Sequence, residues 1–100
     1  MTRKVLLTTA LIPAFVSFAL AADPNHGEAV VKRWCAECHL IAQDQKSSTE
    51  APPFSSIAKR PDFDEAKVAY FLLDPHPKMP NFPLSRTEAG DIAAYIGSLR

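Results

Sequence analysis

The sequence has few cysteines, no excess of either charge and no strand pattern, and each shortage excludes a class of protein. The formal net charge over 100 residues is +0, whereas a protein that binds nucleic acid presents a basic face to the phosphates. No segment alternates apolar and polar residues as a half-buried strand does, and no internal repeat is present. We therefore predict a small all-α protein with no nucleic-acid partner.

The only two cysteines lie in one run, Cys35-Ala36-Glu37-Cys38-His39. Cys-x-x-Cys-His is the pattern that attaches a c-type haem covalently. Residues three and four apart on a helix share a face, so both thiols and the imidazole can point toward one planar ligand. The motif predicts one covalent haem c, with Cys35 and Cys38 joined to the haem vinyl groups and His39 bound to the iron.

Three other uses of a Cys-x-x-Cys pair remain open, namely a redox dithiol, half of a zinc site and a short structural disulfide. The dithiol is expected in a βαβ setting, whereas residues 27–34 before the motif have a helical pattern. Tetrahedral zinc needs two further ligands, and the remaining histidines, His26 and His76, stand at no usual ligand spacing. We interpret His26 as a solvated surface residue.

The first residues have the outline of a secretory signal peptide. Arg3 and Lys4 precede an apolar stretch, and Ala19-Leu20-Ala21 is a small-x-small cleavage pattern. We predict that residues 1–21 are cleaved and that 22–100 form one domain in the periplasm, where such haems are attached. An uncleaved anchor is the alternative, because 5–22 reaches the lower limit for a membrane span. Pro13 and the cleavage pattern argue against it, so we expect no membrane insertion of the mature chain.

Three helices are predicted from an N-capping residue followed three positions later by glutamate, in the pairs Asn25 with Glu28, Asp62 with Glu65, and Ser85 with Glu88. The first helix should run from about Asn25 to about Glu37, the second should stop at Asp74-Pro75, and the third should reach the chain end. One short helical turn is expected over 54–58. Residues 42–53 and 75–83 are expected to be loops, the second stiffened by four prolines.

An iron bound by His39 has a sixth position to fill. Once residues 1–21 are removed, Met79 is the only methionine, and it lies in the proline-rich loop, where the backbone has few conformations to lose. We predict that His39 and Met79 are the two iron ligands. His76 in the same loop and an open or water-filled position are the alternatives.

With these residues identified, the mature chain resembles a small class I cytochrome c, of the monohaem cytochrome c family. Gly27, Val31 and Cys35, spaced by four, match the glycine, the apolar contact and the first haem cysteine of the family's first helix. Residues 91–96 resemble the last helix, where an aliphatic residue and a tyrosine pack against that glycine. The resemblance implies a class I cytochrome c fold, with three main helices plus loops wrapped around one haem. Val31 departs from the aromatic residue that the family often has.

The segment Ala51-Pro52-Pro53-Phe54 resembles the Gly-Pro-x-Leu stretch of the same family. By that match the Pro52 carbonyl accepts a hydrogen bond from the second ring nitrogen of His39, which fixes the ring, although Ala51 replaces the glycine. We interpret Trp34 as a core residue, with packing on the porphyrin as the alternative.

An iron with both axial positions filled by protein suits electron transfer and not catalysis. We therefore expect a soluble periplasmic electron carrier, a monomer that is not an enzyme and that meets its redox donor and acceptor proteins transiently. Lys46 and Lys78 are candidates for docking. The alternatives are a tightly held relay subunit of a periplasmic dehydrogenase, and a ligand-binding or peroxidase-like haem protein if Met79 does not bind the iron.

Overall fold

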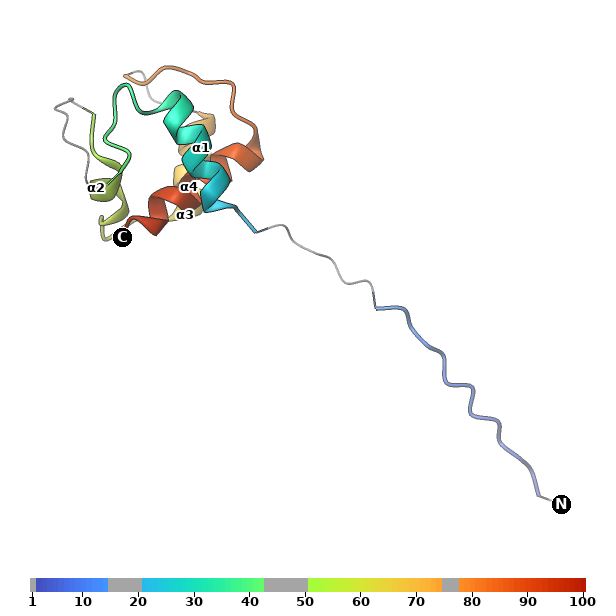
Figure 1. Ribbon diagram of the computed structural model, residues 1–100. Coiled ribbons are helices and arrows are strands. Elements are labelled where there is room, and N and C mark those ends of the chain that lie inside the picture. Colours follow the sequence, from blue (N-terminus) through green and yellow to red (C-terminus); the bar gives the residue numbers. More distant parts are fainter. Residues whose placement is uncertain (1, 15–20, 43–50, 75–77) are drawn as a thin grey trace.

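The computed structural model describes residues 2–14, 21–42, 51–74 and 78–100, and its described residues contain helices but no strand. The helices are α1 (Pro24–Trp34), α2 (Phe54–Ala58), α3 (Glu65–Leu73) and α4 (Arg86–Ser98). Figure 1 shows α1 and α4 crossing, with α3 behind them and α2 to one side. The all-α class and the three main helices are therefore confirmed.

The first helix differs at both ends from the prediction. Asp23, not Asn25, is its N-cap, because the Asp23 carboxylate accepts from the backbone N–H groups of Asn25 at 2.9 Å and His26 at 3.3 Å. Proline at the first helical position fits this start, since its missing N–H is not needed there. The helix ends at Trp34, before Glu37, because the haem motif forms a turn of its own.

The predicted starts of α2 and α4 are confirmed, whereas the predicted start of α3 is wrong. The turn at 54–58 is α2, and α4 has the full capping box, with Ser85 and Glu88 bonded reciprocally at 3.1 and 3.0 Å. In α3 the cap is Asp64 and not Asp62, because residues 60–63 form a turn closed by the hydrogen bond from Phe63 N to Arg60 O at 3.1 Å. Asp64 accepts from Lys67 N at 3.0 Å.

The crossing of α1 and α4 is a contact between two backbones at Gly27. A Cβ atom built at Gly27 would collide with the backbone carbonyl of Asp91 and stand 2.9 Å from Ile92 N. Only a residue without a side chain allows this approach. The nearest atoms of α4 to this position belong to its backbone, at Asp91 and Ile92, within the segment that resembles the family's last helix.

Asp91 joins the start of α1 to α4 from a buried position, with 4% of its surface exposed. Its carboxylate accepts from Asp23 N at 2.7 Å and lies 2.6 Å from His26 Nδ1. The Asp23 N–H, and then His26, hold the pKa of Asp91 below its usual range, while the hydrogen bond to Asp91 raises the pKa of His26. His26 is therefore an ion-pair partner and not only a solvated residue.

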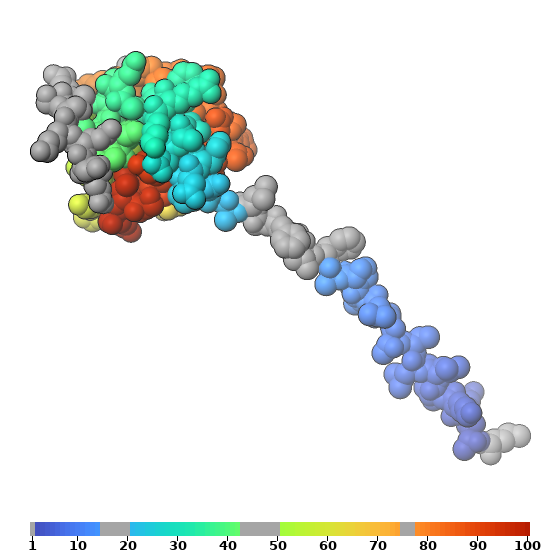
Figure 2. Space-filling view, in the orientation of Figure 1, coloured from blue at the N-terminus to red at the C-terminus, as the bar shows by residue number. Residues whose placement is uncertain are grey.

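The core draws buried side chains from all four helices, and α4 contributes more of them than any other helix. Figure 2 shows α1 and α4 lying together on its visible face. The largest fully buried side chains of the core are those of Val31 and Ile92, each 0% exposed. By contrast, the large apolar residues of the N-terminal segment, such as Val5 and Leu6, are 81% and 90% exposed. Among the described residues, no helix is both long and apolar enough to cross a bilayer.

Candidate haem-binding site

The Cys-x-x-Cys-His motif follows α1 as a turn that keeps helical hydrogen bonding. Cys35 N donates to Val31 O at 2.8 Å, and His39 N donates to Cys35 O at 3.0 Å. The motif lies outside α1, contrary to prediction, yet the bond between residues four apart retains the spacing on which the prediction relied. Tyr95 of α4 anchors the chain just after the motif, because its hydroxyl donates to Ile41 O at 2.6 Å.

The ring of His39 is held by the segment that includes Pro52. His39 Nδ1 lies 2.7 Å from Pro52 O, so the hydrogen bond implied by the resemblance is present. Because a carbonyl can only accept, Nδ1 carries the proton and a neutral ring keeps its lone pair on Nε2. The Phe54 ring lies 4.9 Å from the His39 ring, and Phe54 N donates to Leu40 O at 2.9 Å, which ties the two segments together.

The two cysteines differ in environment. Cys35 is 6% exposed, and burial raises the pKa of its thiol to about 11, whereas Cys38 is exposed. The attacking cysteine of a redox dithiol has a lowered pKa and an accessible thiol. Cys35 has neither property, so its buried environment argues against the redox dithiol.

A cavity of about 880 Å³ opens between the motif, α2 and α3. Apolar side chains form much of its wall, among them Phe54, Ile57, Phe63, Val68, Phe71 and Leu72. Phe71 of α3 remains 39% exposed although it is a large apolar residue, because its side chain lines this cavity. A wall of this kind with a few polar groups is what a bound organic cofactor requires.

Met79 comes to the same place from the proline-rich loop. A second cavity, of about 290 Å³, adjoins the first, and both are bounded by the residues they share, Glu37, Cys38, His39, Met79 and Pro80. Cys35 lines the second cavity as well. The structure thus brings together Cys35, Cys38, His39 and Met79, with Pro52 behind the imidazole.

This residue set fits a haem c. It combines two thiols, an imidazole with its lone pair on Nε2, a thioether and an apolar wall around two adjoining cavities. Across the described ranges, no group of three or more His, Cys, Asp or Glu residues is placed to hold a metal ion, which gives the zinc alternative no support there. His76 and Lys46 lie outside the described residues, and Lys78 is exposed at the edge of the larger cavity.

Sequence reasoning missed several contacts that position the site. Trp34 is partly buried against the core, as expected, but its ring also lies 5.4 Å from that of Phe82. The ring contact of Phe54 and the hydroxyl bond of Tyr95 were missed too. No local signal identifies these partners, because each pair is distant in sequence.

Residues 22–96 match the family described as cytochrome c oxidase, cbb3-type, subunit III. A protein named cytochrome c-552, from Bradyrhizobium diazoefficiens, is 67% identical over 85 residues, which cover 84% of this chain and 82% of that protein. No solved structure matches significantly.

Proposed function

We propose that this protein is a soluble periplasmic electron carrier with His39 and Met79 as its iron ligands. The premise is that the chain belongs to the family of the cbb3-type cytochrome c oxidase subunit III and is a c-type cytochrome with covalently bound haem c. The family match and the cytochrome c-552 relative support electron transport by a haem c. The haem supplies an iron that alternates between Fe(III) and Fe(II). The proposal adds which residues hold the haem and where the protein works.

Cys35 and Cys38 attach the haem, and His39 supplies Nε2 to the iron. The bond from His39 Nδ1 to Pro52 O supports this role, because it fixes both the tautomer and the direction of the ring. The Phe54 ring restrains the imidazole further. A ligand fixed in this way needs little rearrangement when the iron changes oxidation state.

Met79 supplies the sixth ligand, and its position carries the functional proposal. It bounds both cavities together with Cys38 and His39 although it comes from a separate loop. A thioether together with an imidazole as iron ligands would give a higher reduction potential than two imidazoles. It also leaves no position for a substrate, which favours an electron carrier over an enzyme.

Export and processing belong to the same proposal. Residues 1–21 are a signal peptide that is removed, and 22–100 are the cytochrome domain. The family match begins at residue 22, next to the N-cap Asp23 of α1, which supports this boundary. The mature domain then carries nine basic and eleven acidic residues, and its redox partners contact it transiently as it moves between them.

A relay subunit of a larger redox complex is the second candidate. The matched family is described as a subunit of an oxidase, and α3 exposes 72% of Tyr70 and 40% of Leu73, an apolar area that a permanent partner would cover. Copurification at near-equal amounts with a catalytic subunit would favour this candidate. Isolation of the cytochrome alone, at full yield, would favour the free carrier.

The sixth ligand is tested by replacing Met79 with alanine. We expect the ferric Met79→Ala protein to bind cyanide or imidazole at least about ten-fold faster than wild type, because no thioether must leave first. Tyr70→Ala, on the exposed side of α3, is the control and should bind at the wild-type rate. A Met79→Ala protein with the wild-type spectrum and wild-type kinetics would show that another group occupies the position.

A further inference from the structure

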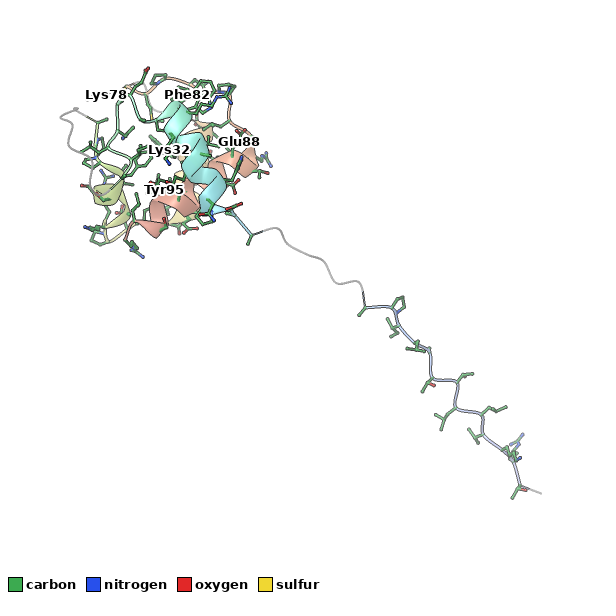
Figure 3. All side chains as sticks on the ribbon, in the orientation of Figure 1. Lys32, Lys78, Phe82, Glu88 and Tyr95 are labelled. Carbon is green, nitrogen blue, oxygen red and sulfur yellow. The ribbon has the colours of Figure 1, made fainter. Side chains whose placement is uncertain are left out.

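The end of α1 and the loop that carries Met79 meet through two aromatic rings. The rings of Trp34 and Phe82 lie 5.4 Å apart at an interplanar angle of 41°, and the Arg33 guanidinium carbon lies 5.0 Å from the centre of the Trp34 ring. Figure 3 places Phe82 beside the end of α1. Trp34 directly precedes Cys35, and Phe82 follows Met79 by three positions, so the pair links the two segments that hold the haem.

Side chains hold this loop more than its backbone does. Within the described residues 79–84, the one backbone-to-backbone hydrogen bond runs from Leu84 N to Phe82 O at 2.8 Å. Met79 and Leu84 pack against the core only as partly buried residues. The Trp34 and Phe82 pair therefore restrains the loop on the side of α1.

The loop is stiff enough to transmit that restraint to Met79. Pro80 and Pro83 restrict the backbone on both sides of Phe82. Trp34, Phe82 and Met79 also line the same cavity, of about 290 Å³. If Phe82 loses its partner, the short segment from Met79 to Phe82 gains freedom as one piece.

We propose that Trp34 and Phe82 act as a pair of positioning residues that keep the Met79 sulfur on the haem iron. The inference rests on the proposed function, in which Met79 is the sixth ligand. The pair would determine how often the thioether leaves the iron, and so how well the protein resists binding small ligands. Trp34 then has a role that neither core burial nor packing on the porphyrin describes.

The rate of cyanide binding to the ferric holoprotein tests this role. At saturating cyanide the rate is limited by release of Met79. An aromatic pair of this kind is expected to alter the release by about two- to ten-fold. Trp34→Ala and Phe82→Ala should each accelerate binding by that factor, and the double variant should be no faster than the faster single one, because both changes remove one contact. The ring-retaining changes Trp34→Phe and Phe82→Tyr should stay within about two-fold of wild type.

A change of overall stability must be distinguished from this effect. Ile92→Val removes one buried methylene from α4 and should lower the free energy of unfolding, while leaving the cyanide rate unchanged. The proposal is overturned if Ile92→Val accelerates binding as much as Phe82→Ala, if the two alanine changes multiply, or if neither has an effect. A Met79→Ala protein that binds cyanide at the wild-type rate would instead contradict the proposed ligand itself.

Discussion

The crossing of α1 and α4 and the cavity beside α2 and α3 are built on opposite principles. At the crossing, the two helices pack so closely that only glycine fits at position 27, and Val31 and Ile92 are fully buried. At the cavity, Phe71 and its neighbours line open space of about 880 Å³. The first region is complete in the polypeptide, whereas the second is the place that we propose for the haem. On that proposal, haem attachment should stabilise α2 and α3 more than it stabilises the crossing.

Removal of the haem should change the stability of the two regions more than any other alteration. A chain this short rarely gains more than about 3–5 kcal/mol from its own core. We expect the Cys35→Ser, Cys38→Ser chain to lose most of its free energy of unfolding, with amide protection lost throughout α2 and α3 and retained only partly in α1 and α4. Hydrogen exchange followed by NMR measures this. Equal protection in all four helices would contradict the contrast between the regions.

Closure of the crossing by a methyl group should have the next largest effect. Gly27→Ala forces a Cβ atom into the backbone of Asp91 and should cost about 3 kcal/mol of unfolding free energy. Gly90→Ala is the matched control, because nothing lies within 4 Å of a Cβ there. In the interior of α4 that change should stabilise the protein by about 0.5–1 kcal/mol. Denaturant unfolding of both holoproteins measures the two changes in unfolding free energy, which should have opposite signs. A Gly27→Ala protein as stable as wild type would refute the backbone contact.

Tyr95 connects the two regions, since it lies on α4 and its hydroxyl holds Ile41 just after the haem motif. Tyr95→Phe keeps the ring and removes one buried hydrogen bond, which should cost about 1–2 kcal/mol. The change should also loosen the motif, which is measured as faster amide exchange at residues 39–42. Loss of stability with no change of exchange there would place the effect in α4 alone.

The pair formed by His26 and Asp91 should give the smallest effect, as a dependence of stability on pH. The pKa of His26 is raised in the folded protein, so its contribution is complete below about pH 6.5 and is lost as the pH rises through the raised value. The pKa of Asp91 is lowered, so its contribution is lost only in acid, as the pH falls below about 4. Unfolding of wild type and His26→Gln between pH 5 and 9 should show that the decline above about pH 6.5 is absent from the variant. The same decline in both would assign it to another group.

Local sequence signals predicted the elements well and their exact starts less well. The bounds of α2 and the capping box of Ser85 and Glu88 could be read directly, because each depends on residues a few positions apart. The caps of α1 and α3 were misplaced by two residues, at Asp23 and Asp64, because neighbouring polar residues compete and the turn before each helix decides between them.

At the site, the motif and Met79 were predicted from the residue types, and the contact with Pro52 came from the family resemblance. The side-chain pairs between segments distant in sequence were not predictable. Trp34 with Phe82, and His26 with Asp91, join segments that are adjacent only after the chain has folded. Periodicity and motif spacing contain no information about such partners.

The intact mass and absorption spectrum of the protein matured in a periplasm report directly on whether a haem is attached. We expect a chain that begins at Ala22 and carries the mass of one haem through denaturation, with a reduced spectrum typical of low-spin c-type haem. A colourless product with the mass of the bare polypeptide would contradict this expectation.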